Sequence, residues 1–460
     1  MKKFTLLFFM FSLFMTVTSG IRTGHAVEAK IATGGYHSLI LKADGTLWAT
    51  GLNSYGQLGI GITVNQMSPV QIGKETTWTD IAAGYAHSIA LKANGTLWAW
   101  GNNEYGQLGD NTTIQRTSPV QIGSDTSWAA ISAGYAHTLA LKADGTLWAW
   151  GQNDSGQLGT PIIEGSKYYA PIQIGTEDTW ARITAGYNHS IALKTNGTLW
   201  GWGWNGLGQL GTITPAAQDF PVQIGTDSNW TTIAAGNYYT IALKAGTLWA
   251  WGANTYGQLG DGTETAKLVP VKIGTASTWT ALTAGGYHSL ALKTDGTLWS
   301  WGLNSVGQLG HGTTVNRNTP GQITTGINWA NMSAGFAHTI ALKADNTFWA
   351  WGNNFFSQLG DGTRTNRNSP VQIMGSKLLT INKAGAGSGT VTGNGTYAYG
   401  TIQQITALAD KGSTFSGWSG DCSGTTSPLN VLINGKKTCT ANFYKFPWAM
   451  FLPAISGGAK

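Results

Sequence analysis

One unit, repeated seven times, dominates this chain. Residues 84–109, GYAHSIALKANGTLWAWGNNEYGQLG, have near-copies between residues 34 and 360. The copies recur about every 50 residues, a period typical of propellers and solenoids. Each opens on a Gly-x-x-His signature or its variant, and the opening glycines are Gly34, Gly84, Gly134, Gly186, Gly236, Gly285 and Gly335.

Each copy predicts four short strands. In the second copy, an apolar run at 87–92 is followed by Asn94-Gly95 and by a further run at 96–100. Asn-Gly or Asp-Gly between apolar runs favours a type I′ hairpin. The run 78–83 supplies another strand. The run 119–122 supplies a fourth, because its leading proline is tolerated where a strand begins or lies at a sheet edge.

Seven such units without helical periodicity predict an all-β fold, a seven-bladed β-propeller, followed by a small β-rich C-terminal module. The 65 glycines and the low charged fraction of 10% agree with many short strands and tight turns. A linear solenoid and a pair of sandwiches are the alternatives. The first copy has Thr50 where the others have tryptophan. Its first strand, at 30–33, must meet the last blade if the ring closes.

Tryptophans recur at fixed positions of the repeat. Seven occupy the Thr-Leu-Trp or Thr-Phe-Trp position, six lie two residues later, and six open a first strand, so 19 of the 22 are repeat-defined. Trp98 and Trp100 share one face of their strand because side chains alternate with period two. We expect these tryptophans to be core residues that pack against the next blade, not a platform for ligands.

The ends of the chain differ from the repeats. Residues 1–26 have two lysines, an apolar run and a Gly-His-Ala ending, the pattern of a secretory signal peptide. We predict seven repeats over 27–375, a second module over 376–444 and a short apolar tail over 445–460. No later apolar run reaches the 18 residues of a membrane span. We expect no stable membrane span, and a monomer.

Charge and cysteines restrict the partners and the compartment. The formal net charge is +6, but three basic residues and no acid lie within 1–26, which leaves 24 bases against 21 acids. Such a balance predicts no nucleic-acid partner. In an exported chain, Cys422 and Cys439 should form a disulfide worth roughly 3 kcal/mol. Two free thiols are the alternative.

One repeat position carries a set of histidines that suggests a metal site. Equivalent residues of neighbouring blades should lie on the order of 10 Å apart, too far for one zinc ion, whose ligands approach to about 2 Å. We therefore predict no metal and no cofactor, and a structural, hydrogen-bonded ring. The ring consists of His37, His87, His137, His189, Tyr239, His288 and His338.

No catalytic constellation stands out. Seven of the 21 acids recur at turn positions or directly after Gly-Gln-Leu-Gly, where Asp is a turn former. Glu177-Asp178 is the only adjacent pair of acids, in a predicted loop. No nucleophile motif, phosphate-binding glycine loop or EF-hand spacing occurs. We predict that the protein is not an enzyme.

The strings Gly-x-x-His-Ser/Thr-x-Ala-Leu-Lys, Leu-Trp-Ala-Trp-Gly and Asn-x-x-Gly-Gln-Leu-Gly cover about 340 residues. They resemble the repeats of the regulator of chromosome condensation (RCC1) family. The resemblance implies a seven-bladed propeller that serves as a binding platform. Eukaryotic relatives include the exchange factor of the small GTPase Ran, and a secreted bacterial relative inhibits β-lactamases. The loop wedge on which exchange depends has no counterpart here.

The C-terminal segment carries Leu-Thr-Ile at 379–381, Phe-Ser-Gly-Trp-Ser-Gly-Asp-Cys at 415–422 and Cys-Thr-Ala-Asn-Phe at 439–443. It is similar to the divergent internalin-type B-repeat modules of bacterial surface proteins. These modules are regarded as stalks or adhesion accessories. The resemblance implies an exported bacterial protein, located outside the cell, at its surface or in the periplasm.

Binding function is expected where the copies differ, because loops on one rim of a rigid ring carry recognition. Exposed Tyr and Trp are favoured anchors, and we select Trp204, Tyr105, Tyr168, Tyr169 and Tyr256. The first hypothesis is an exported binding or scaffold protein whose rim recognises a protein or glycan. The alternatives are a regulator of the exchange-factor type and an extracellular hydrolase with acids converging from different blades.

Overall fold

The computed structural model describes residues 27–162, 167–214, 216–323, 328–398, 401–433 and 436–445. The predicted signal peptide and all of the predicted tail after Lys445 lie outside the described residues. The described part consists of strands and connecting loops, and it contains no helix that could cross a membrane.

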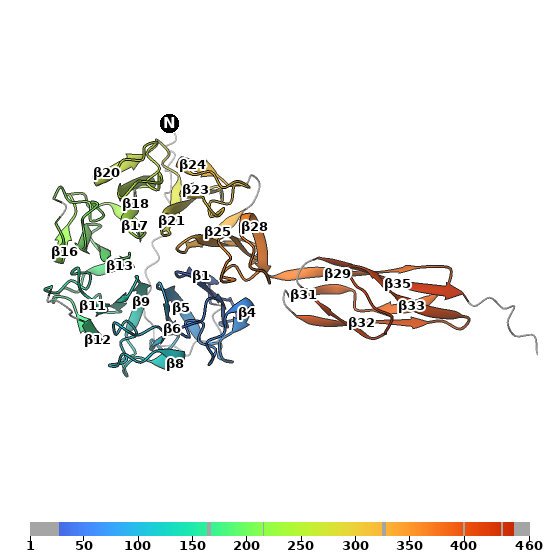
Figure 1. Ribbon diagram of the computed structural model, residues 1–460. Helices are drawn as coiled ribbons and strands as arrows, with labels where there is room; N and C mark the ends of the chain where they lie inside the picture. The colour runs from blue at the N-terminus through green and yellow to red at the C-terminus, as the bar shows by residue number, and fades with distance from the viewer. Residues whose placement is uncertain are drawn as a thin grey trace, which may run out of the picture.

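Seven four-stranded antiparallel sheets stand in a ring, which confirms the predicted propeller (Figure 1). Within each blade the strands follow chain order from the channel outwards. The first four blades contain β1 (Lys30–Thr33), β2 (His37–Leu41), β3 (Leu47–Gly51) and β4 (Gln66–Gln71); β5 (Trp78–Ala83), β6 (His87–Lys92), β7 (Leu97–Gly101) and β8 (Arg116–Gln121); β9 (Trp128–Ala133), β10 (His137–Lys142), β11 (Leu147–Gln152) and β12 (Lys167–Gln173); and β13 (Trp180–Ala185), β14 (His189–Lys194), β15 (Leu199–Gly203) and β16 (Gln218–Gln223).

The other three blades repeat this plan. They contain β17 (Trp230–Ala235), β18 (Tyr239–Lys244), β19 (Thr247–Gly252) and β20 (Lys267–Ile273); β21 (Trp279–Ala284), β22 (His288–Lys293), β23 (Leu298–Gly302) and β24 (Arg317–Gln322); and β25 (Trp329–Ala334), β26 (His338–Lys343), β27 (Phe348–Gly352) and β28 (Arg367–Met374).

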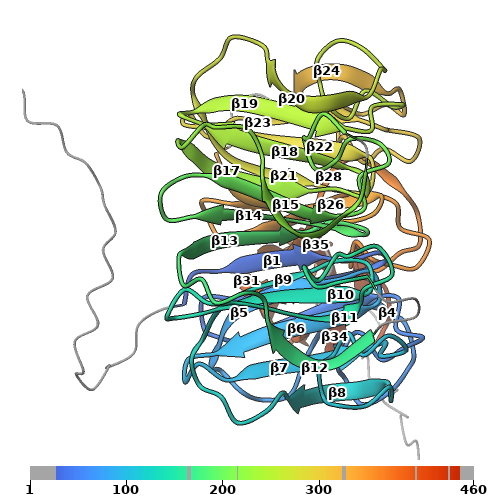
Figure 2. The same cartoon turned by 90° about the vertical axis from the view of Figure 1, so that its left-hand side faces the viewer.

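The two faces of the disc carry different connections. Seen edge on, the strands run across its thickness (Figure 2). The connections between first and second strands and the long connections between third and fourth strands lie on one side, which we call the loop face. The Asp-Gly-type turns and the links between blades lie on the other, the turn face. The loop face carries the longest connections, such as residues 52–65 between β3 and β4.

The outer strand differs from its prediction. β8 begins three residues before Pro119, so this proline lies inside the strand. The pairing of β7 with β8 shifts register between Ala99 and Gly101, where a bulge accommodates the extra residues. Pro119 has no partner in this register and β8 is the outer edge of its sheet, so the missing proline N–H removes no ladder hydrogen bond.

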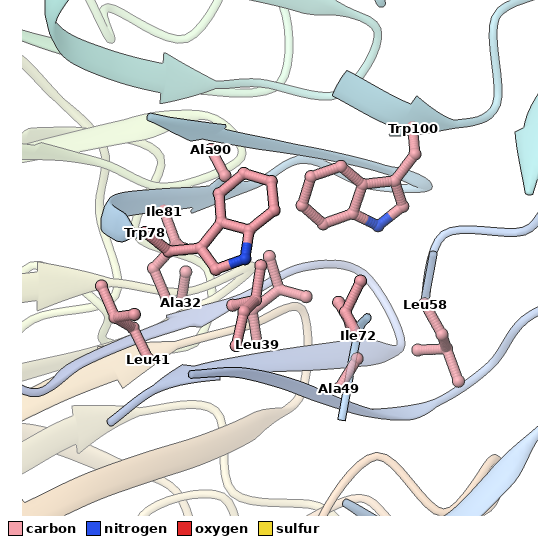
Figure 3. Packing of buried hydrophobic residues seen from close by; sticks show 11 residues of the cluster. Ala32, Leu39, Leu41, Ala49, Leu58, Ile72, Trp78, Ile81, Ala90 and Trp100 are labelled. Atoms are coloured by element: carbon pink, nitrogen blue, oxygen red, sulfur yellow. The ribbon is translucent and has the colours of Figure 1, made fainter. Parts of the chain in front are cut away.

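The core lies between blades. Trp78 and Trp100 pack with each other and with residues of the first blade such as Leu39 and Leu58 (Figure 3). Trp98 packs edge-on against Trp78 and against the same cluster. They are core residues as predicted, but the predicted direction is wrong, because they contact the preceding blade. Trp98 stays half-buried under the Lys92 ammonium, which lies 3.5 Å from its ring centroid.

A closed belt of main-chain hydrogen bonds surrounds the channel. In every blade, the amide after the signature glycine donates to a carbonyl at the equivalent turn of the next blade, over 3.1–3.3 Å. The signature glycines leave no room for a side chain. A Cβ on Gly134 would lie 2.5 Å from the Gly186 carbonyl oxygen and 2.3 Å from Cε1 of His137.

The ring closes without exchange of strands. The first blade meets the last through a hydrogen bond of 3.2 Å from the Phe336 amide to the Gly34 carbonyl, and through Thr33, whose Oγ1 lies 2.7 Å from Ser333 Oγ. A mixed core of both blades, including Ile31, Ile340 and Phe348, fills the junction. This contact rules out an open solenoid, and it confirms the predicted role of the first strand.

The C-terminal module follows the last blade directly and projects from the side of the disc (Figure 1). Two sheets with the orders β31-β29-β35-β33 and β30-β32-β34 enclose a core that includes Trp418 and Phe443. Cys422 and Cys439 form a buried disulfide within this core. The strands are β29 (Ser376–Ala384), β30 (Gly389–Thr392), β31 (Gly395–Ala398), β32 (Ile402–Ala409), β33 (Ser413–Gly420), β34 (Leu429–Leu432) and β35 (Lys437–Lys445).

The close contacts of the belt predict that even alanine at a signature glycine lowers the stability of the protein greatly. Gly134→Ala should lower stability by about 3 kcal/mol, because the new methyl group clashes with main chain that cannot move. Gly123→Ala is the matched control, since nothing lies within 4 Å of its Cβ and only its φ of +61° opposes alanine. That control should cost about 1 kcal/mol. Thermal unfolding measures both, and equal losses would contradict the belt.

Candidate functional site

The predicted histidine ring lies inside the propeller, between blades. All seven side chains are fully buried. Each histidine Nε2 lies 2.9–3.2 Å from a serine or threonine hydroxyl of the next blade. Tyr239 takes the same place, with its hydroxyl 3.0 Å from Ser289 Oγ. The ring thus joins every pair of neighbouring blades.

Hydrogen bonding determines the tautomer of these histidines. Ser88 Oγ donates over 2.8 Å to the Gln57 carbonyl oxygen, which also accepts the Trp100 indole N–H over 2.9 Å. The single serine proton is therefore used, and His37 Nε2 must be the donor toward Ser88. Burial lowers the pKa of His37 to about 3, so the imidazole is neutral. Among the described residues, no group of three or more His, Cys, Asp or Glu could hold a metal ion.

A second ring, of aromatic side chains, lies at the loop-face end of the channel. One aromatic residue follows each signature glycine by one or two positions, and neighbouring rings touch all the way round. We call this set the collar, and it consists of Tyr36, Tyr85, Tyr135, Tyr187, Tyr238, Tyr287 and Phe336. Centroid separations between neighbours range from 4.1 to 6.3 Å.

The collar presents neutral rings. Its members are half-buried. Burial, followed by the neighbouring Tyr36, raises the pKa of Tyr85 to about 12, and burial also raises the pKa of Tyr187 and of Tyr238. These phenols cannot act as tyrosinate bases near neutral pH. The channel, with a volume of about 120 Å³, is smaller than most small-molecule pockets, which enclose roughly 300–1,000 Å³.

Two of the selected anchors extend the collar. Trp204 lies 5.3 Å from Tyr238 and Tyr256 lies 5.4 Å from Tyr287, both centroid to centroid. Phe356, which we did not select, lies 5.1 Å from Tyr36 in the same way. These rings widen one aromatic surface on the loop face.

The other three selected residues lie further out. The Tyr105 ring has the Lys167 ammonium 4.6 Å from its centroid. Tyr168 and Tyr169 belong to the outer strand β12, where Tyr168 packs between blades and Tyr169 is exposed. The structure therefore does not bring the five residues together in one site.

The sequence did contain a signal for the collar. An aromatic residue follows every signature glycine, but at the first position in four copies and at the second in Tyr36, Tyr238 and Tyr287. Because of this offset, an alignment of the copies without gaps does not place the aromatic residues at one common position. The backbone bonds of the belt bring both positions to the same mouth of the channel.

The protein is thus a β-propeller built from Gly-x-x-His repeats. Buried histidines join its blades, and aromatic side chains surround one mouth of its channel. A family model described as the RCC1-like domain matches residues 121–393, more than half of the chain, and RCC1 repeat models match 44–91 and 94–141. A second RCC1 repeat model matches 29–57 and 78–107. The chain belongs to the RCC1-like family. A model described as the divergent InlB B-repeat domain matches residues 379–447, which confirms the second resemblance.

Solved structures share the fold. Prp20p from Saccharomyces cerevisiae, described with its binding to Gsp1p and histones, is 25% identical, with a TM-score of 0.62 over 68% of this chain and 81% of that chain. Human WBSCR16 is 21% identical, with a TM-score of 0.66 over 79% and 98%. Yeast RCC1 (Prp20) bound to Kap60 is 19% identical, with a TM-score of 0.63 over 78% and 90%. Family and fold support a protein-interaction or regulator role.

The buried histidines predict a specific acid sensitivity. Between pH 6.5 and 3 an unfolded chain protonates each histidine, whereas the folded chain does not, so stability falls as the pH falls through this range. His137→Tyr introduces the side chain that Tyr239 provides in the fifth blade, and Ser190 offers the same partner as Ser289. As the pH is lowered from 7 to 4.5, the free energy of unfolding of this variant should rise by about 2–3 kcal/mol relative to that of the wild type.

Urea unfolding at both pH values measures this gain, and the wild-type protein measured in parallel removes the contribution of the acidic groups. An unchanged difference between variant and wild type at the two pH values would contradict the neutral, buried ring.

Proposed function

We propose that this protein is an exported bacterial binding protein that acts without catalysis and recognises a protein partner through the loop face. The collar is the observation that carries the proposal. A monomeric protein seldom exposes a continuous aromatic surface unless it binds something there, and Tyr and Trp are favoured contact residues in interfaces. The interactions described for the relatives with Gsp1p, histones and Kap60 support a protein partner.

Other apolar side chains are also exposed on the loop face. The long connections between third and fourth strands expose Val64, Ile114, Ile213 and Val315, and Ile213 is 80% exposed. Phe355, beside Phe356, is 69% exposed. An apolar surface spread over several blades suits a flat protein epitope better than a small molecule.

Three features support export. Residues 1–26 have the composition of a signal peptide. The C-terminal module matches a B-repeat model, and it contains the disulfide between Cys422 and Cys439, a bond that persists in oxidising compartments.

A regulator of the exchange-factor type is the second candidate, favoured by the 25% identity with Prp20p, which is described as binding Gsp1p. The two candidates require different compartments. A secreted propeller cannot meet a cytosolic GTPase.

Fractionation of cells that produce the full chain should place the protein outside the cytosol, with an amino terminus near residue 27. Amino-terminal sequencing measures this directly. Cytosolic protein that retains Met1 would refute export and favour the regulator.

Loop-face binding predicts a loss of partner on Trp204→Ala combined with Tyr256→Ala. Both side chains border the collar, so the double variant should lose most of the partner cross-linked by the mature wild-type protein in its own cell envelope. Tyr444→Ala, an exposed ring on the C-terminal module, is the control and should keep it. Mass spectrometry quantifies the captured protein, and thermal unfolding verifies that each variant is folded. Equal capture by all three proteins would refute the loop face as the site.

A further inference from the structure

We propose that the partner of the loop face presents a basic segment, whose arginine or lysine side chains dock on the sector formed by the second and third blades. This inference rests on the proposed function and adds the chemistry of the partner. The receiving groups are the Tyr105 and Tyr135 rings and the carboxylates of Glu104 and Asp154.

The charges of the inner loop face are one-sided. We define this area as the signature segments, 34–37 and its equivalents, and the segments after Trp-Gly, 52–57 and its equivalents. Across all seven blades these segments contain two acidic residues, Glu104 and Asp154, and no lysine or arginine. They also contain thirteen aromatic residues besides Tyr239 of the buried ring. A cation is attracted both to the faces of aromatic rings and to carboxylates.

The two acids occupy the same repeat position in neighbouring blades. Burial raises the pKa of Tyr105, and the nearby Glu104, Tyr135 and Asp154 raise it further, so all three lie within electrostatic reach of that phenol. Tyr135 in turn stacks on Tyr187 at a centroid separation of 4.1 Å. Negative charge and ring faces therefore coincide in one sector.

These carboxylates are free to bind, unlike most acids on the propeller. Both side chains are exposed. Among the described residues, Glu104 makes no ion pair, and its carboxylate accepts no hydrogen bond. Asp154 accepts one, from Gln152 Nε2 over 2.7 Å. By contrast, Asp110 pairs with Arg116 at 2.7 Å.

A lysine of the protein itself already makes a cation–π contact with one of these rings. The Lys167 ammonium, which makes no ion pair among the described residues, lies 4.6 Å from the centroid of the Tyr105 ring. Beside it is a cleft of about 530 Å³, lined by Tyr55, Asn102, Glu104 and Lys167 among others. The cleft has space for further side chains next to the Glu104 carboxylate. An acidic segment would instead face two unpaired carboxylates, so charge complementarity selects a basic one.

The test uses the mature full-length protein and a defined probe, a fluorescein-labelled Gly-Ser peptide containing four arginines. Anisotropy should show binding at low salt that weakens as salt is added. Glu104→Gln combined with Asp154→Asn should weaken it at least tenfold. Glu177→Gln combined with Asp178→Asn is the matched control, because it removes the same charge from the turn face, and it should leave binding unchanged.

A second pair of variants tests the ring. Tyr105→Leu should weaken binding of the arginine peptide several-fold. Tyr444→Leu should not, because this exposed ring lies on the C-terminal module. The same peptide with four glutamates should not bind. No binding of the arginine peptide, or equal losses in both charge variants, would overturn the proposal.

The two proposals fail in different ways. If the aromatic variant Trp204→Ala with Tyr256→Ala loses the captured partner but Glu104→Gln with Asp154→Asn keeps it, the loop face binds without a basic segment and only the present inference is wrong. If neither variant loses the captured partner, the loop-face site itself is wrong.

Discussion

The propeller depends on the close approach of the blades at the channel. Each signature glycine presses against the next blade so tightly that a Cβ would lie 2.6 Å or less from the facing carbonyl oxygen. This approach permits the belt of main-chain bonds, and it places each histidine within reach of the hydroxyl of the next blade. Glycine and histidine are therefore one device, since the imidazole occupies the space that a side chain on the glycine would need. Six copies of this pair, and a seventh with Tyr239 in place of histidine, close the ring without exchange of a strand.

The same constraint produces the aromatic surface. Because the belt holds the signature turns together, the residues after the glycines crowd one mouth of the channel and their rings touch. The His137 and Trp150 side chains lie fully buried between blades, while Tyr135 remains half-buried at the mouth. The buried histidine and the collar residue thus belong to the same repeat and are only one or two positions apart in the sequence. The residues at the mouth therefore differ between copies, while the signature glycine is the same in all seven.

Much of this fold was predictable because the same pattern of strands and turns recurs in seven copies, so that each copy supports the assignment made in the others. The strands, the closure by 30–33 and the burial of histidines and tryptophans all followed from repeat position. The packing direction of Trp100 did not, because strand alternation identifies a face and not the neighbour that it meets. The collar was missed because its aromatic residue is one position after the signature glycine in some copies and two positions after it in others. Their convergence depends on hydrogen bonds between blades, which no single copy specifies.

The junction of the first and last blades shows how departures from the repeat compensate one another. Thr50 replaces the tryptophan whose indole would bond to the last blade, and its hydroxyl lies 3.1 Å from the Ser357 carbonyl oxygen instead. Ser38 retains its bond of 2.8 Å to the Gln358 carbonyl. The buried departures are thus compensated by local hydrogen bonds. The carboxylates of Glu104 and Asp154 are exposed, and neither makes an ion pair among the described residues. Exposed carboxylates without an ion pair beside aromatic rings are what selection for a partner, rather than for the scaffold, would leave.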